Sequence, residues 1–107
     1  MTIDPDVRAV AKDFGLDAAL LQAVVKAEGN IVKAVQCSIP SVQTRDQALR
    51  ITARSAVHAL SDYVKQTQRS AFVTYWAARW APQGASNDPT NLNKNWPKNV
   101  LAFWNGQ

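Results

Sequence analysis

One acidic side chain stands apart from the others in this sequence of 107 residues. Seven of the eight acidic residues are aspartates, and Glu28 is the single glutamate. It lies seven positions after Leu21, four after Val24 and three after Val25, so a helix would carry all four on one face. Apolar neighbours and the negative end of the helix dipole both disfavour the charged carboxylate. We therefore expect Glu28 to keep its proton near neutral pH, as a general acid for glycosidic cleavage must. The competing interpretation is that Glu28 only borders the apolar face and points into solvent.

The sequence contains few residues that could serve as a nucleophile or bind a metal ion. One cysteine, Cys37, excludes an internal disulfide and a multi-cysteine metal site, and a single histidine, His58, removes most other metal sites. A Cys37–His58 nucleophile pair is formally possible, but the apolar, β-branched neighbours of Cys37 favour a buried structural thiol. His58 is interpreted as a partly buried residue of a helix. We predict no metal site and no organic cofactor.

Four tryptophans are many for a chain of this length. Indole faces stack on sugar rings, so one or two of them could line a glycan groove, although tryptophans at helical spacing usually belong to the core. Trp76 and Trp104 are predicted to be core residues. Trp80 and Trp96 flank the polar segment 82–93, and we treat them as candidates for contact with a substrate.

Capping residues and apolar periodicity predict the helices that would position these side chains. Asp4, Asp17 and Asn30 stand at N-cap positions, and Thr44 forms a capping box with Gln47. Apolar residues then recur with the period of a helix. The predicted helices cover residues 5–14, 18–28, 31–36, 45–66, 70–81 and 97 onward.

The predicted fold class is all-α. Residues 37–43 are β-branched and interrupted by Pro40, so we expect a loop or a short extended piece there, and residues 82–93 should form an ordered loop. The sequence has no repeat, no low-complexity tract and no linker, and its 47% apolar residues suffice for one core. We predict a single compact helical domain over residues 1–107, with little or no β-structure.

Charge and hydropathy limit the partners and the location. Twelve basic against eight acidic residues give a net charge of +4, which favours anionic partners such as nucleic acid, lipid head groups or bacterial cell wall. No apolar run approaches the roughly 20 residues that span a bilayer, so we expect no membrane insertion. The first ten residues lack the basic start and apolar stretch of a signal peptide. We expect synthesis in the cytoplasm, and any action outside it would need another export route.

Three stretches resemble the lysozyme-like superfamily, in particular its goose-type lysozyme and lytic-transglycosylase branch and related small phage domains. Residues 20–30, LLQAVVKAEGN, are similar to the helix that ends in the family's catalytic glutamate. Residues 42–64 resemble the extended piece and long helix at the base of the substrate groove. Residues 75–104 resemble the aromatic-rich and closing helices of phage wall-degrading domains. The resemblance implies a compact lysozyme-like helical fold that cleaves the MurNAc–GlcNAc backbone of peptidoglycan.

Carried over residue by residue, the resemblance assigns Glu28 as the general acid/base. In a lytic transglycosylase this one glutamate suffices, because the sugar closes on itself as a 1,6-anhydro product. Gln43 matches a groove glutamine that hydrogen-bonds the sugar, and Asn87 and Asp88 fall in the loop that approaches the glycan from the far side. If water attacks instead, a second carboxylate is expected, for which Asp46 and Asp88 are the candidates.

The sequence departs from the family's pattern at three points. Gly29 stands where a serine usually follows the glutamate, and SVQT at residues 41–44 stands where a Gly-Leu-Met-Gln type of run is usual. The chain is also shorter than most members, with little room for a β-lobe. These departures bear on the activity more than on the fold.

Two other functions remain open. Residues 20–36 also resemble the first two helices of a Fis-like helix-turn-helix, and a basic chain suits DNA. The recognition helix would then be expected at about residues 41–53, with Arg45 and Arg50 contacting bases or phosphates. Its Pro-interrupted start and the tryptophan-rich C-terminal third argue against DNA binding. The third possibility is an inactive wall-binding or virion structural domain. Without a signal peptide, a wall enzyme would reach its substrate through a holin, a secretion route or the phage virion itself.

Overall fold

The computed structural model describes residues 2–62, 69–80 and 95–106, and these ranges contain helices and no strand. The helices are α1 Pro5–Phe14, α2 Ala18–Glu28, α3 Ile31–Gln36, α4 Arg45–Asp62, α5 Arg69–Trp80 and α6 Trp96–Asn105. The all-α prediction is therefore confirmed, and residues 37–43 form turns and bends without a strand. Helix starts agree with the predicted ones to within one residue. The predicted continuation of α4 to residue 66 and the predicted loop 82–93 lie outside the described residues.

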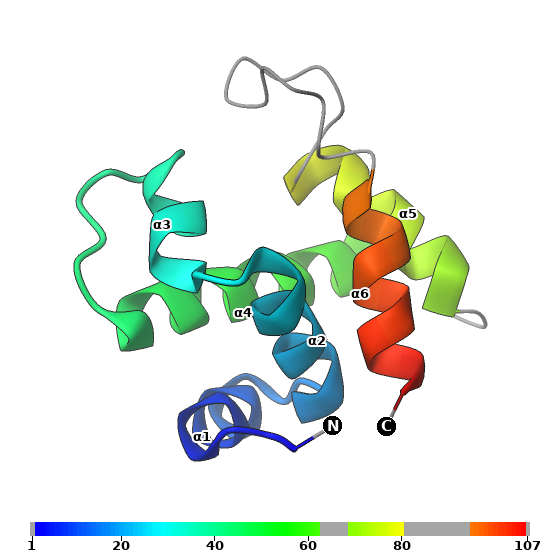
Figure 1. Cartoon of the computed structure of the whole chain (residues 1–107), viewed down its shortest axis with the longest axis horizontal. Helices are drawn as coiled ribbons and strands as arrows, with labels where there is room; N and C mark the ends of the chain where they lie inside the picture. The colour runs from blue at the N-terminus through cyan, green and yellow to red at the C-terminus, as the bar shows by residue number, and fades with distance from the viewer. Residues whose placement is uncertain (1, 63–68, 81–94, 107) are drawn as a thin grey trace.

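Helix α4 runs across the back of the molecule and connects its two sides (Figure 1). Helices α1 and α3 pack against it on one side, and α5 packs against it on the other. Helix α2 lies in front of α4, and its most extensive partner is α6.

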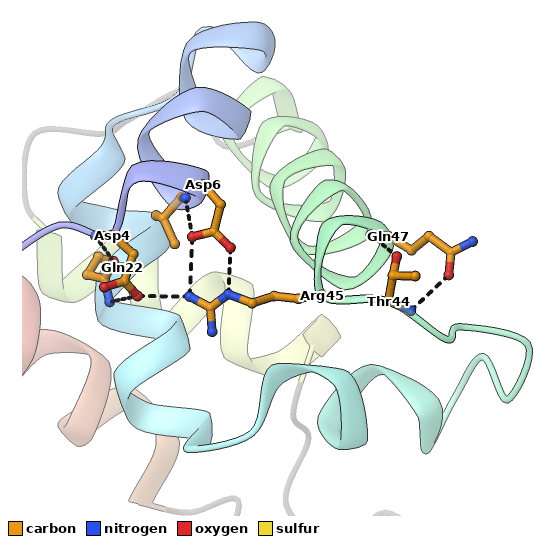
Figure 2. Close-up of polar contacts among 7 residues, drawn as sticks. Asp4, Asp6, Gln22, Thr44, Arg45 and Gln47 are labelled. Atoms are coloured by element: carbon orange, nitrogen blue, oxygen red, sulfur yellow. Dashed lines mark hydrogen bonds and ion pairs between the residues drawn. The ribbon is translucent and has the colours of Figure 1, made fainter.

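Local capping follows the sequence closely at three of the four predicted caps. Asp17 accepts a hydrogen bond from the backbone amide two residues later at 2.9 Å, and Asn30 accepts one from the amide three residues later at 3.1 Å. Thr44 and Gln47 each accept a bond from the other's backbone amide at 3.1 Å, as Figure 2 shows in part. These contacts satisfy amides that the first turn of a helix leaves without a partner.

The predicted N-cap position of Asp4 is confirmed, but its side chain bonds elsewhere. Asp4 stands at the N-cap position, but its carboxylate makes no capping bond. Instead, Arg45 donates to Asp4 Oδ2 at 2.8 Å and to Asp6 Oδ2 at 2.7 Å (Figure 2). Gln22 exchanges two further bonds with Asp4, at 2.9 and 3.2 Å. The Asp4 carboxylate therefore binds the Arg45 guanidinium instead of the amides of the first turn of α1. We call Asp4, Asp6, Gln22 and Arg45 the Arg45 network.

Helix α2 forms the centre of the core. Its six residues from 20 to 25 are all buried, including the amide side chain of Gln22, which belongs to the Arg45 network. Six consecutive buried residues cover every side of the middle of α2, so its neighbours must position it accurately. Trp76 and Trp104 are core residues, as predicted.

Phe103 on α6 does not belong to the core. Its side chain is 38% exposed. The buried row of α6 follows Trp96, Val100 and Trp104, which recur every four residues, and Phe103 lies to one side of that row. Leu101, on the opposite flank, is half-buried.

Candidate functional site

The carboxyl group of Glu28 is half-buried and held at one oxygen by two tryptophans. Trp96 Nε1 donates to Glu28 Oε1 at 2.8 Å, and Trp80 Nε1 donates to the same oxygen at 3.2 Å. The second oxygen, Oε2, accepts no hydrogen bond from the described residues. The described residues thus fix the orientation of the carboxyl group and leave Oε2 without a partner among them.

Three helix ends converge at this carboxyl group. Glu28 is the last residue of α2, Trp80 is the last residue of α5, and Trp96 is the first residue of α6. Trp76 lies behind them, with its ring centroid 5.9 Å from that of Trp80 and 5.3 Å from that of Trp96. The Trp76 Nε1 group donates to Ser55 Oγ on α4 at 3.0 Å, which anchors the aromatic cluster on the long helix. The sequence singled out Glu28, Trp80 and Trp96 separately, and the fold brings them together.

A second carboxylate–indole bond lies at the opposite end of the same helix pair. Trp104 Nε1 donates to Asp17 Oδ2 at 3.1 Å, near the end of α6 and the start of α2. The start of α6 therefore meets the end of α2, and the end of α6 meets the start of α2, so the two helices are antiparallel. One indole bond at each end fixes the register of α6 along α2. Asp17 and Trp104 are 87 positions apart, and no local pattern in the sequence predicts their contact.

The electrostatic surroundings of Glu28 are unusual for a surface glutamate. It forms no ion pair with any described lysine, arginine or histidine. The two groups that donate hydrogen bonds to Glu28 are neutral indoles. Glu28 is the last residue of α2 and lies near the partial negative charge of the helix C-terminus. Partial burial removes it from some of the solvent as well. Glu28 is thus oriented by hydrogen bonds without a compensating positive charge.

The backbone directly after Glu28 adopts a strained turn. Gly29 has φ +75° and ψ −57°, and the amide of Asn30 donates to the carbonyl oxygen of Glu28 at 2.9 Å. These values describe the rarer of the two γ-turn forms, which is costly for any residue with a Cβ. Glycine rather than serine at this position therefore has a conformational reason. It allows an abrupt change of direction into α3 that leaves Glu28 at the very end of α2.

A surface recess crosses α4 between the segment that follows α3 and α5. Its larger part has a volume of about 320 Å³ and is lined by Ile39, Ile51, Arg54, Ser55, His58 and Arg79. A second part of about 260 Å³ is lined by Ile39, Ser41, Val42, Gln47, Arg50 and Ile51. The two parts share two isoleucines and therefore adjoin, and we call them together the α4 recess. Glu28 lines neither part, but Arg79 directly precedes Trp80, which holds the Glu28 carboxyl group.

The other predicted site residues do not join Glu28 within the described part of the chain. Gln43 is exposed before α4, and its backbone amide donates to Gln47 Oε1 at 2.9 Å. Asp46 is exposed and accepts a bond from Arg50 at 3.1 Å. Asn87 and Asp88 lie outside the described residues. Of the predicted substrate contacts, only Trp80 and Trp96 are placed at the carboxyl group.

Two predictions about burial are wrong. Cys37 is exposed, and its thiol donates to the Lys33 carbonyl oxygen at 3.4 Å. Helix α3 ends one residue earlier, so Ile31 and Val35 occupy its buried face and Cys37 falls in the turn that follows. His58 is also exposed, on the side of α4 that borders the recess. Its position could have been inferred from the spacing of Arg50, Arg54 and His58, which recur every four residues on one face of α4.

Comparisons with known protein families, curated proteins and solved structures give no match for this chain. The described residues contain no group of three or more His, Cys, Asp or Glu side chains that could hold a metal ion. None of the helices in the described ranges combines the length and the apolar character needed to cross a bilayer. The candidate site is accordingly defined by its geometry, which centres on Glu28.

Proposed function

We propose that this chain is a lysozyme-like domain that cleaves the MurNAc–GlcNAc backbone of bacterial peptidoglycan, with Glu28 as general acid/base. The observation that carries the proposal is the way Glu28 is held: half-buried, fixed at Oε1 by two neutral N–H donors, and unbonded at Oε2 within the described residues. A general acid needs an oriented carboxyl group that can both give and take a proton. A carboxylate paired with a guanidinium is much less suited to this, because the cation stabilises its charged form.

The two indole bonds would assist the reaction by a simple electrostatic route. When Glu28 gives its proton to the leaving glycosidic oxygen, negative charge develops on its carboxyl group. The Trp80 and Trp96 N–H groups already point at Oε1, so they need no reorganisation to stabilise that charge. The carboxylate then accepts the proton of the attacking hydroxyl, which belongs to the same sugar in a transglycosylase and to water in a muramidase.

The transglycosylase route has additional support from Asp46. A hydrolytic enzyme would be expected to use a second carboxylate beside the sugar. Asp46 is exposed and paired with Arg50, which holds it at the surface of α4. Asp88, the other candidate for a second carboxylate, lies outside the described residues, so the support concerns Asp46 alone. Access to the wall would then come through a holin, a secretion route or a virion.

The arginines expected to contact DNA are engaged by carboxylates, which weighs against the helix-turn-helix alternative. Arg45 pairs with Asp4 and Asp6, and Arg50 pairs with Asp13 and Asp46. Phosphate contacts would have to compete with these pairs. A gel shift on duplex DNA over a range of salt concentrations tests this alternative, since phosphate contacts give a steep salt dependence.

Zymography on purified peptidoglycan tests the proposed activity, with wild type compared with Glu28→Gln. Because both indoles bond to Oε1, the single carbonyl oxygen of glutamine can preserve both contacts while the acid is lost. We expect wild type to clear the gel and the variant to lose at least about 100-fold of the activity. Equal clearing by both proteins would remove Glu28 from the mechanism. Binding to the wall without clearing by wild type would favour an inactive wall-binding domain.

A further inference from the structure

The α4 recess has a basic character that the proposed reaction at Glu28 does not use. Arg50, Arg54 and His58 follow one another along α4, and Arg79 faces them from α5. No aspartate or glutamate lines either part of the recess. A concave surface whose charged lining side chains are arginines, with no carboxylate among them, concentrates anions. The recess therefore selects for negative charge on whatever occupies it.

Arg54 is the cation in the recess most open to a ligand. Its side chain is exposed and forms no hydrogen bond or ion pair with any described residue. Arg50, in contrast, is bonded to Asp13 and Asp46, which raises its pKa and occupies its N–H groups. An arginine with a free guanidinium can bind a carboxylate with two parallel hydrogen bonds. Arg54 is the residue whose loss should reveal a bound anion.

The recess also has an apolar part, which restricts the kind of anion. Ile39 and Ile51 line both parts, Val42 lines one, and the side chain of Ile39 is 38% exposed. A bare phosphate chain would leave these side chains without an apolar partner. A ligand that alternates small apolar groups with free carboxylates would satisfy both halves of the surface. The larger part alone reaches the lower end of the roughly 300–1,000 Å³ that small-ligand sites occupy.

We propose that the α4 recess binds the carboxylate-bearing peptide that peptidoglycan strands carry, with Arg54 as the principal carboxylate contact. This inference rests on the proposed function for its choice of ligand. Alanine methyl groups of such a peptide would contact Ile39 and Ile51, and a free carboxylate would meet Arg54. The glycan would lie at Glu28 while its peptide lies across α4.

The connection between the two sites runs through α5. Arg79 lines the recess, and Trp80, the next residue, donates to Glu28. Consecutive residues of a helix project about 100° apart, so α5 can present one side chain to the recess and the next to the carboxyl group. A strand bound at both places would be fixed against the reacting oxygen at two points. The peptide is thereby expected to improve the positioning of the scissile bond.

Calorimetric titration of the intact protein with a synthetic peptide tests the inference without any cleavage. The probe contains alanine, γ-linked glutamate and a diamino acid with free carboxylates, and a second peptide has every carboxylate amidated. Arg54→Ala should weaken binding of the free peptide about tenfold, the loss expected for one charge-assisted contact. Arg8→Ala is the matched control, because Arg8 is exposed on α1, lines no part of the recess and has no side-chain partner among the described residues. It removes the same charge and should change binding less than twofold.

The outcomes separate this inference from the proposed function. Equal weakening by Arg54→Ala and Arg8→Ala, or equal binding of the amidated peptide, would overturn the inference even if Glu28-dependent cleavage is found. Binding that depends on Arg54, together with cleavage that does not depend on Glu28, would uphold the recess and overturn the proposed catalytic role. Tighter binding of duplex DNA than of the peptide, again lost in Arg54→Ala, would assign the recess to nucleic acid and reject the peptide.

Discussion

The two ends of the α2–α6 pair carry the same chemical contact in opposite electrostatic settings. At one end Trp104 donates to Asp17 at 3.1 Å, and at the other Trp96 donates to Glu28 at 2.8 Å. Asp17 stands at the start of α2, where the helix dipole and the amide of Ala19 stabilise a carboxylate. Glu28 stands at the end of α2, where the dipole opposes one. The same indole–carboxylate bond thus occurs at the positive end of the α2 dipole and at its negative end.

The two carboxylates also differ in how they use their oxygens. Asp17 binds the backbone amide with Oδ1 and the indole with Oδ2, so both oxygens are occupied. Glu28 accepts both of its indole bonds at Oε1. An amide replacement must therefore break a contact at Asp17 and can keep every contact at Glu28. This asymmetry makes it possible to separate stability from activity with single substitutions.

The largest expected change in stability comes from removing the indole donor at either end of the α2–α6 pair, Trp96 or Trp104. Trp96→Phe and Trp104→Phe should each lower the free energy of unfolding by about 1.5–3 kcal/mol, because each variant loses an indole hydrogen bond and part of a buried ring. Both variants keep an aromatic ring in a buried position. Chemical denaturation with fluorescence detection measures the two losses.

Activity should distinguish the two tryptophan variants although their stabilities are similar. Trp96→Phe releases Glu28 from its shorter bond, so its cleavage rate should fall by about tenfold or more, while Trp104→Phe should stay close to wild type under conditions where both are folded. Similar rates for both would show that the orientation of Glu28 by Trp96 is irrelevant to catalysis.

The glycines beside the two ends give the next prediction. Gly15 has φ +64° and ψ +33°, within the left-handed region, whereas Gly29 lies outside it at φ +75° and ψ −57°. A Cβ at either position would meet no atom within 4 Å, so the cost of alanine is conformational alone. Gly15→Ala should cost about 1–2 kcal/mol and Gly29→Ala about 1–3 kcal/mol, the larger of the two. Thermal unfolding monitored by circular dichroism shows which variant loses more stability. A smaller loss in Gly29→Ala than in Gly15→Ala would mean that the turn after Glu28 is unstrained.

The Arg45 network should give the smallest change, and one that depends on pH. Its hydrogen bond from Arg45 lowers the pKa of Asp6 below the usual 3.8. A lowered pKa in the folded state contributes stability that is present above pH 3.8 and is lost as the pH falls through the folded value. Both partners are more than 40% exposed, so solvent screening limits the loss in Arg45→Met to about 0.5–1 kcal/mol at pH 7. Urea unfolding from pH 7 down to pH 2 should show the difference between the two proteins shrinking below about pH 4. A difference that stays constant over this range would mean that Arg45 acts only through packing.

Local signals in the sequence predicted most of the fold. The helix bounds follow from apolar periodicity and from side chains that act within three residues, as at Asp17, Asn30 and Thr44. The contacts that no local signal could predict join residues far apart in the sequence. The Asp4 carboxylate binds Arg45, 41 residues away, instead of capping α1, and no residue near Asp4 in the sequence indicates this pairing.

The candidate site was predictable only in part. Glu28 stood out because helical spacing placed it on an apolar face, and Trp80 and Trp96 stood out because they flank a polar segment. That both indoles share one oxygen of Glu28 depends on how three helix ends meet, which no local pattern encodes. The same limit applies to the α4 recess, whose basic residues come from α4 and α5 and whose apolar part includes the segment after α3.

The most direct test of the account compares Glu28→Gln with Asp17→Asn in two assays: release of soluble fragments from purified peptidoglycan, and the free energy of unfolding. Glu28→Gln should lose at least about 100-fold in rate and unfold nearly as wild type does. Asp17→Asn should keep its rate within about twofold and lose about 1 kcal/mol of stability, because its amide oxygen cannot replace both carboxylate oxygens. Wild-type release by Glu28→Gln, or an equal loss of rate in both variants, would contradict the assignment of proton transfer to Glu28.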